Sequence, residues 1–254
     1  MQVAAPRARP LRVATFRLPR DGMGLDCCAD AVSMRASSGR FALADGATEA
    51  YDSGRWARLL TRAWTATPVT GGEDVAEALG RLGQTLHRSW SRRPLAWFAE
   101  EKARQGSFAT LVGFQLCGTA GWYAVAIGDS CLFQERAGEL RAAFPLNDPA
   151  EFGHRPALVP SFPQRHRSWA RGVRVATGSA APGDVFWLMS DAIACWYLGT
   201  WVRQRGLRRA LNEAMLAPDD RPLSRLVSRE RRAGRLRDDD VAVLRIEVAE
   251  APRR

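Results

Sequence analysis

Lysine is almost absent from this sequence, and so are several features that identify common classes of protein. Lys102 is the single lysine among 37 basic residues, so arginine carries nearly all of the positive charge. With 27 acidic residues the formal net charge is +10, which suits a polyanionic or phosphorylated partner. A GC-rich coding sequence also favours arginine over lysine, so the charge alone does not identify that partner.

No segment has the pattern of a targeting or membrane-spanning sequence. The first 13 residues contain arginines, but no apolar stretch of about 7–15 residues follows them, so we predict no secretory signal. The most apolar region, residues 185–202, is interrupted by Ser190, Asp191 and Thr200. Because a charge in the middle of a span is costly in lipid, this region is predicted to be a buried strand that continues into a helix. We expect a cytoplasmic protein without membrane contact.

The cysteines form no recognisable framework. There are five of them, an odd number, and none has the paired spacing of a zinc site. We expect all of them to be small buried residues in a reducing compartment. They are Cys27, Cys28, Cys117, Cys131 and Cys195.

The length of 254 residues accommodates one large domain or two small ones. A hydrophobic content of 46% excludes a disordered or collagen-like chain. Residues 1–10 are predicted to be a disordered N-terminal arm. No linker is recognisable after them, so we predict a single domain over residues 11–250.

Short strands follow one another along the chain, with helices between some of them. The expected strands are 41–45, 108–116, 122–129, 131–136, 139–144, 184–191 and 238–248. The expected helices are one with Ser53 as its N-cap and others over 75–90, 207–215 and 223–227, and residues 145–172 are expected to form a long ordered loop. Glycine-containing turns between successive strands favour antiparallel pairing, so the fold class is α+β.

Carboxylates lie at the ends of the expected buried strands. Asp45 and Asp191 each end an apolar strand, Asp129 follows a third, and residues 238–240 are three acids that open a fourth. Carboxylates at the ends of buried strands repel one another and lose solvation unless a cation or hydrogen-bond donors compensate them. If these ends converge, they form an all-oxygen site, which suits Mg²⁺ or Mn²⁺ rather than Zn²⁺.

Five short motifs occur in an order and spacing that resemble one known family. They are ALADG (42–46), GSFATLVG (106–113), AIGDS (126–130), DVFWLMSD (184–191) and DDDVAVL (238–244). Together they resemble the metal-dependent Ser/Thr protein phosphatases, the protein phosphatase 2C-like or PPM family, in a bacterial branch. The resemblance implies a four-layer α-β-β-α sandwich of two antiparallel sheets flanked by helices.

The resemblance also implies a site with two Mn²⁺ or Mg²⁺ ions bridged by a water. Asp45 would bridge both ions and the Gly46 carbonyl would add a ligand. Asp191 and Asp239 would hold one ion between them, and Asp129 would support a third, weaker one. No serine elbow, catalytic-cysteine motif or P-loop is found in the sequence, which agrees with a mechanism that uses no protein nucleophile.

Several accessory positions depart from the family pattern. Ala29 stands where the family has a glutamate, and Ala47 stands where eukaryotic members have a histidine. The arginine that grips phosphate would fall at Leu25, and Arg20 is the nearest candidate to replace it. Asp238 and Asp240, on either side of Asp239, are expected to be solvated acids.

Three functions are compared on these residues. The first is a metal-dependent phosphatase that hydrolyses phosphoserine and phosphothreonine in a protein substrate of a bacterial Ser/Thr kinase. The altered accessory positions leave open a catalytically weak phosphatase-like module that binds a phosphoprotein or a regulatory partner. The third, a basic nucleic-acid binder, has no helix-turn-helix, zinc-finger or stacking motif to support it, so nucleic acid is not expected as a partner.

The arginine excess is concentrated in two stretches. Residues 201–237 contain eleven arginines against four acids, and residues 152–183 contain five arginines and no acid. We expect part of this excess, including Arg165, Arg167 and Arg171, to line a groove for acidic, phosphorylated protein segments.

Overall fold

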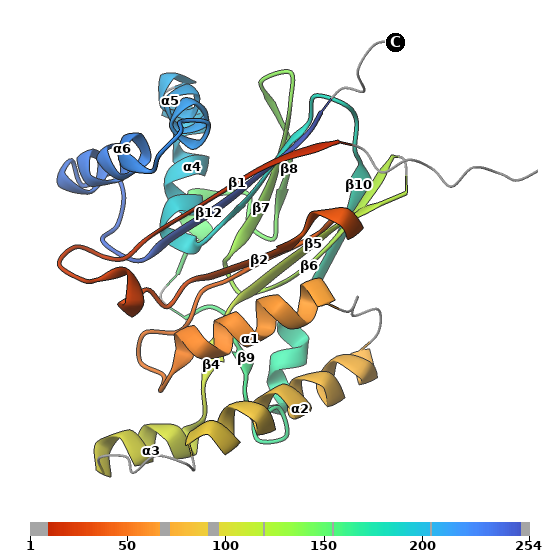
Figure 1. The fold of residues 1–254 in the computed structure, drawn as a ribbon, viewed down its shortest axis with the longest axis vertical. Helices are drawn as coiled ribbons and strands as arrows, with labels where there is room; N and C mark the ends of the chain where they lie inside the picture. Colours follow the sequence, from red (N-terminus) through yellow and green to blue (C-terminus); the bar gives the residue numbers. More distant parts are fainter. Residues whose placement is uncertain are drawn as a thin grey trace, which may run out of the picture.

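Two antiparallel sheets lie face to face, and helices cover the outer surface of each (Figure 1). The computed structural model describes residues 10–66, 72–90, 97–118, 120–153, 155–203 and 205–249. The predicted N-terminal arm, residues 1–10, lies outside these ranges except for its last residue. The predicted α+β class and four-layer α-β-β-α arrangement are confirmed.

The order of the strands brings β1 and β2 to the same side of the sandwich. The first sheet has the order β1-β12-β11-β7-β8 and the second β10-β6-β5-β3-β2. The strands of the first sheet are β1 (Leu11–Leu18), β7 (Cys131–Arg136), β8 (Glu139–Phe144), β11 (Val185–Met189) and β12 (Val241–Val248). Those of the second are β2 (Ala31–Arg35), β3 (Arg40–Ala44), β5 (Leu111–Cys117), β6 (Gly121–Ile127) and β10 (Arg174–Ser179), and a small third sheet pairs β4 (Phe108–Ala109) with β9 (Val159–Pro160).

The helices divide into two groups, one on each outer surface (Figure 1). On the side of the second sheet, α1 (Ser53–Ala66) packs on β2 and β3, α2 (Gly72–Trp90) packs on α1, and α3 (Trp97–Gln105) lies farther from the sheet (Figure 1). The group on the first sheet consists of α4 (Asp191–Arg203), α5 (Arg205–Met215) and α6 (Arg221–Arg232). Short 3-10 turns are η1 (Leu25–Cys27), η2 (Ala36–Ser38), η3 (Pro149–Glu151) and η4 (Arg167–Gly172).

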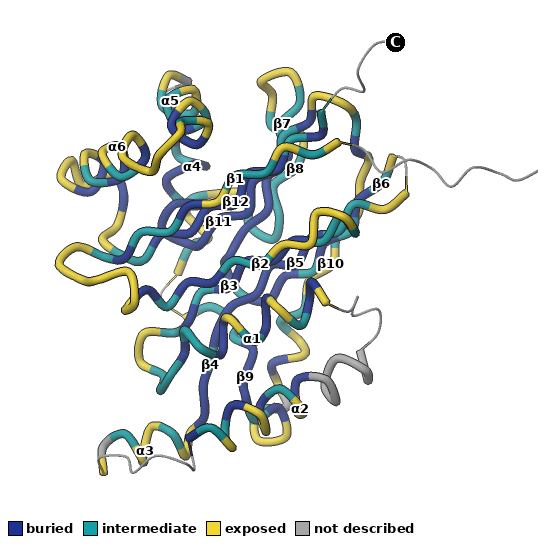
Figure 2. The backbone as a smooth tube through the Cα atoms, in the orientation of Figure 1, coloured by how far each residue is buried: buried dark blue, intermediate teal, exposed yellow. Residues whose placement is uncertain are grey.

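The core between the sheets follows from the two-residue period of the strands. In β3, Phe41 and Leu43 face the other sheet, whereas Ala42 and Ala44 pack under α1. The same alternation in β12 directs Leu244 toward the inter-sheet core. The central strands form the most buried part of the chain (Figure 2). Full burial of one such side chain stabilises the fold by roughly 1.5–3 kcal/mol.

Four elements have no counterpart among the sequence predictions. They are β1, β2, β10 and α3. Three are edge strands, and β10 exposes five of its six residues, so its hydrophobic alternation is too weak to be recognised. The region 145–172, expected to be a loop, contains η3, β9 and η4.

Two local predictions were wrong in detail. Ser53 is the first residue of α1 and not its N-cap, because the carbonyl of Asp52 accepts the first helical hydrogen bond from the Trp56 N–H. The strand expected over 108–116 is divided at Thr110. Thr110 leaves the regular ladder and bonds to Asp45 instead, which ties this break to the carboxylate end of β3.

The cysteines are all free, but not all are buried. Cys28 and Cys131 are buried as expected, whereas Cys27 and Cys117 are exposed, so the expectation was wrong for these two. Within the described residues, no helix combines the length and the hydropathy needed to cross a membrane.

Candidate functional site

The predicted carboxylates meet at one end of the two sheets. Met189 of β11 pairs with Val243 of β12, which places Asp191 beside Asp239. In the second sheet, the strand registers place the last residues of β3, the first residues of β5 and the last residues of β6 at the same end of the strands. The turn that contains Asp129 then connects β6 of the second sheet to β7 of the first. Antiparallel order therefore gathers acids that are far apart in sequence.

Asp45 is held by a short chain of hydroxyl groups. Its backbone N–H donates to the Thr110 hydroxyl at 3.0 Å, and its carbonyl accepts from the Thr110 N–H at 2.8 Å. The Thr110 hydroxyl is in turn 2.6 Å from that of Ser130, the residue after Asp129. Next to Asp45, Gly46 has no room for a side chain, since a Cβ there would lie 2.7 Å from the Ser53 carbonyl carbon. The backbone around Asp45 is therefore fixed by packing and hydrogen bonds together.

Asp30 belongs to this group, although the sequence prediction did not include it among the site residues. It precedes β2, is fully buried, and neither carboxyl oxygen has a hydrogen-bond partner among the described residues. Buried carboxyl groups are normally paired, so an unpaired one indicates a missing ligand or cation. The sequence signal was its place directly after Ala29, the position where the family has a glutamate.

Asp191 and Asp239 share a guanidinium group. Asp191 begins α4, and its Oδ1 accepts from the Ala192 N–H at 2.6 Å. Its other carboxyl oxygen forms an ion pair with Arg237 Nη2, which also lies 3.5 Å from Asp239 Oδ2. Arg237 therefore stands between the two acids that the family resemblance assigns to one ion.

The carboxyl groups are close enough to perturb one another. Burial raises the pKa of Asp45 well above its usual value, and the charges of Asp30 and Asp191 raise it further. Burial also raises the pKa of Asp30, although the nearby Ser190 and Asp45 side chains act to lower it, and the charges of Asp240 and Asp191 raise it further. The pKa of Asp129 is raised to about 7 by burial and by Asp191, against the opposing charge of Arg237. Burial and Asp191 likewise raise the pKa of Asp239. Such a cluster favours a bound cation.

Asp238 and Asp240 are not merely solvated, which corrects the sequence expectation. Asp240 accepts from the Ala29 N–H at 2.7 Å and from the Arg20 N–H at 3.0 Å. Asp238 accepts from the Asp21 N–H at 2.9 Å. Both acids therefore attach the β1–β2 loop to the start of β12.

Arg20, the residue predicted to bind phosphate, enters this arrangement through its backbone. Within the described part of the chain its guanidinium makes no hydrogen bond or ion pair, while its N–H bonds to Asp240. The side chain of Arg17, in contrast, is fixed next to the acidic group, because its Nη1 donates to the Asp30 carbonyl at 3.3 Å. The backbone of Arg20 therefore lies next to the acidic group, and the contacts of its side chain do not test the predicted phosphate binding.

The donor set fits a hard divalent cation. All the converging groups are carboxylates or carbonyls, and buried carboxyl oxygens of Asp30 and Asp129 lack partners among the described residues. As they stand, however, no three His, Cys, Asp or Glu side chains in the described ranges are arranged to hold a metal ion. Loading the site therefore requires side chains, Arg237 among them, to turn.

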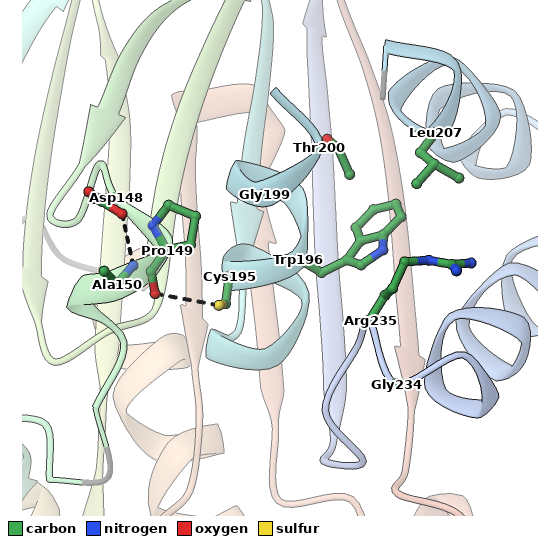
Figure 3. Close-up of a pocket in the computed structure, with 10 residues that line it drawn as sticks. All are labelled: Asp148, Pro149, Ala150, Cys195, Trp196, Gly199, Thr200, Leu207, Gly234 and Arg235. Carbon is green, nitrogen blue, oxygen red and sulfur yellow. Dashed lines mark hydrogen bonds between the residues drawn. The ribbon is translucent and has the colours of Figure 1, made fainter. Parts of the chain in front are cut away.

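A separate cavity of about 480 Å³ lies along α4 (Figure 3). Figure 3 shows Asp148, Pro149 and Ala150 on one side of α4 and Leu207, Gly234 and Arg235 on the other. Arg235, which lines the cavity, is engaged by Glu230 at 2.7 Å.

Comparison with known proteins agrees with this arrangement. A family model described as protein phosphatase 2C matches residues 25–238. The chain belongs to the protein phosphatase 2C family. Membership implies a hydrolase of the phosphatase class. A search of curated proteins gives no match.

Solved structures similar to this chain share its fold at low sequence identity. The catalytic domain of the serine/threonine phosphatase PstP, in complex with two manganese ions, is 18% identical with a TM-score of 0.58, covering 94% of this chain and 99% of that one. Stp1 from Staphylococcus aureus is 10% identical with a TM-score of 0.62, over 98% and 99%. PppA, a regulatory component of T6SS in Pseudomonas aeruginosa, is 17% identical with a TM-score of 0.55, over 93% and 97%. At these identities the likeness concerns the fold alone.

Proposed function

We propose that this chain is a metal-dependent protein phosphatase that hydrolyses phosphoserine and phosphothreonine in protein substrates. The observation that supports the proposal most is the convergence of Asp30, Asp45, Asp129, Asp191 and Asp239 at one end of the sandwich. Asp30 and Asp129 are buried with carboxyl oxygens that lack partners among the described residues, which is costly for folding, so their presence in this cluster favours a role outside the stability of the fold.

The proposed ligands are Asp45, the Gly46 carbonyl, Asp191 and Asp239, with Asp129 serving an additional ion. Oxygen donors of this kind suit Mn²⁺ or Mg²⁺. Two such ions, when bound, supply an activated water and compensate the charge of the phosphoryl group.

The chain's own residues position this donor set. The hydroxyl groups of Thr110 and Ser130 orient the backbone of Asp45, and the Ala192 N–H orients the carboxyl group of Asp191. Asp240 holds the loop that leads to Asp30. Such positioning accounts for much of the benefit of a preorganised site, because little reorganisation remains when the substrate arrives.

A second function, a phosphatase-like module with weak or no turnover, is supported by two observations. Ala29, Ala47 and Leu25 replace family residues that assist catalysis or grip phosphate. In addition, Arg237 contacts Asp191 and lies close to Asp239, where an ion would bind. Under this alternative the chain binds a phosphoprotein or a regulatory partner without consuming it.

We further propose that residues 11–250 act as one functional unit in the cytoplasm. The proposed substrates are proteins phosphorylated by a bacterial Ser/Thr kinase. The family match, which spans 25–238, supports the single unit because it covers parts of both sheets and both helical layers.

Turnover of p-nitrophenyl phosphate and of a phosphothreonine peptide with Mn²⁺ tests the proposal. We expect D45N and D191N each to lower kcat/KM at least about 1,000-fold, or roughly 4 kcal/mol of transition-state stabilisation. The matched control is D219N, an exposed aspartate before α6, which should stay within about twofold of wild type. Well-folded wild-type protein that binds Mn²⁺ without any turnover would reject the enzyme and favour the binding module.

A further inference from the structure

A groove runs along the side of the sandwich where β1 and β2, the edge strands of the two sheets, lie near each other. It has a volume of about 410 Å³ and is lined by residues of β1, β2, η1 and α1, together with Asp220 before α6. Neither of the arginine-rich stretches singled out in the sequence, 152–183 and 201–237, contributes an arginine to it.

Positive charge dominates this groove. Arg17 of β1 and Arg58 and Arg62 of α1 line it, against the single acid Asp220. Arg58 and Arg62 are exposed and stand four residues apart on the helix, so their like charges face the same side and repel slightly. Neither side chain forms an ion pair within the described residues. Both guanidinium groups are therefore free to meet an anion from outside.

The groove borders the acidic site. Ala31 lines it and directly follows Asp30, and Arg17 reaches the Asp30 carbonyl. Leu25, the position where the family's phosphate-gripping arginine would fall, also lines it. A chain whose phosphorylated residue lies at the acids can therefore continue into the groove.

The lining also offers apolar surface. Leu25 is 54% exposed and Met34 is 46% exposed, and they are two of the six large hydrophobic residues with high exposure in the described part of the chain. Exposed apolar side chains next to a charged cluster are typical of a surface that binds protein segments. The groove is thus both cationic and partly apolar.

By contrast, Arg165 of the predicted basic stretch is occupied within the fold. Its guanidinium stacks 4.4 Å from the centre of the Phe162 ring and donates to the Arg104 carbonyl at 2.8 Å. The side chain of Arg167 lies outside the described residues. Arg165 thus has contacts within the fold, whereas Arg58 and Arg62 line the groove without an ion pair among the described residues.

We propose that this groove binds an acidic segment of the phosphoprotein substrate next to the phosphorylated residue, with Arg58 and Arg62 as its main charge contacts. The inference rests on the proposed phosphatase function. Charge complementarity supports the proposed binding, because unpaired guanidinium groups recognise carboxylates through strong, charge-assisted hydrogen bonds. The charge that the family places at the position of Leu25 is here provided by neighbouring elements.

Binding of labelled phosphoserine peptides, measured by fluorescence anisotropy in EDTA, tests the groove without turnover. One peptide carries three glutamates on each side of the phosphoserine and the other carries glutamines. We expect the R58A/R62A variant to raise Kd for the glutamate peptide at least about tenfold in 50 mM NaCl, and for the glutamine peptide less than about twofold. In 300 mM NaCl the difference should shrink, because salt screens exposed charges.

The matched control is R171A/R174A, which removes two exposed arginines from the predicted stretch. It should bind both peptides as wild type does, while the charge-reversed R58E/R62E should bind the glutamate peptide more weakly still. Equal losses for both peptides, or an equal loss in the control, would overturn the proposal. Tighter, Arg58- and Arg62-dependent binding of a 20-nucleotide single strand would also overturn it and assign the groove to nucleic acid.

The same variants separate this inference from the proposed function. Turnover of p-nitrophenyl phosphate with Mn²⁺ uses no peptide segment and should be unchanged in R58A/R62A. If the wild type shows no turnover but R58A/R62A still weakens binding of the glutamate peptide more than that of the glutamine peptide, the proposed catalysis is rejected and the proposed binding groove is supported. If turnover is present and the peptide difference is absent, only the groove is rejected.

Discussion

The two ends of strand β11 carry an aspartate each, and the two aspartates have opposite surroundings. Asp184, before the strand, is fully buried and accepts from Arg136 at 2.6 Å, Gln134 at 2.8 Å and the Ala181 N–H at 2.8 Å. Burial alone would raise the pKa of Asp184, but these hydrogen bonds together lower it. Asp191, after the strand, lies among other carboxyl groups and contacts Arg237.

The difference separates structural acids from functional ones. Asp184 has its partners within the chain, and so does Glu230, whose pKa is lowered to about 2 by hydrogen bonds from Arg235 and Trp196. At the other end of β11, Asp30 and Asp129, which lie near Asp191, have raised pKa values and carboxyl oxygens without partners among the described residues. A buried acid with a complete set of partners supports the fold, whereas one without them needs a partner from outside.

The largest effect on the free energy of unfolding is expected at the end of β11 that carries Asp184. D184N removes the charge that Arg136 and the neighbouring donors bind, which leaves buried groups poorly paired. We expect the free energy of unfolding to fall by about 2–4 kcal/mol, measured by urea denaturation.

The same change at the other end, D191N, is the matched comparison. In EDTA it should alter the free energy of unfolding by less than about 1 kcal/mol, because the loss of the Arg237 contact is offset by reduced repulsion among the acids. A loss as large as that of D184N would show that Asp191 is structural and would remove the distinction between the two ends.

A smaller effect is expected from pH in metal-free protein. The pKa of Asp129 is raised to about 7, above its unfolded value, so between about pH 4 and pH 7 the folded chain binds more protons than the unfolded one. Stability should therefore fall as pH rises through this window, by roughly 2 kcal/mol for this group between pH 5.5 and pH 8. Thermal unfolding in EDTA at pH 5.5 and pH 8 measures it.

D129N should flatten that dependence, and Mn²⁺ added at pH 8 should restore the stability of wild type. Glu230 contributes the opposite slope at low pH: its pKa is lowered to about 2, so its stabilisation is lost as pH falls from about 4.5. A metal-free protein that becomes more stable from pH 5.5 to pH 8 would contradict the assignment of unpaired acids to this site.

The smallest effect is expected at Arg237, the cation between Asp191 and Asp239. A metal that binds these acids must displace the guanidinium, so R237A should tighten Mn²⁺ binding about tenfold, or roughly 1.4 kcal/mol, in calorimetric titration of EDTA-stripped protein. R232A removes an exposed arginine of α6 and controls for the change in net charge. Unchanged or weaker binding in R237A relative to R232A would refute the competition.

The main features of the fold and the positions of the acids were predictable from local patterns. The apolar runs before Asp45 and Asp191 and after Asp239 predicted β3, β11 and β12, and the glycine turns predicted antiparallel order. The edge strands β1, β2 and β10 were missed, because a strand with one neighbour and much exposed surface has little hydrophobic alternation to reveal it. The break at Thr110 was missed because it depends on a hydrogen bond to Asp45, 65 residues away.

The sequence by itself determined the fold class, the family and which acids stand at strand ends, since these depend on short-range order along the chain. The tertiary structure decided what each acid meets. Asp184 finds Arg136, Asp240 holds the loop before Asp30, and Asp191 lies beside Arg237. It also brought Arg58 and Arg62, which belong to neither arginine-rich stretch, into one groove with Arg17. The physical reason is that electrostatic partners are set by distance in space, which strand pairing and helix packing establish.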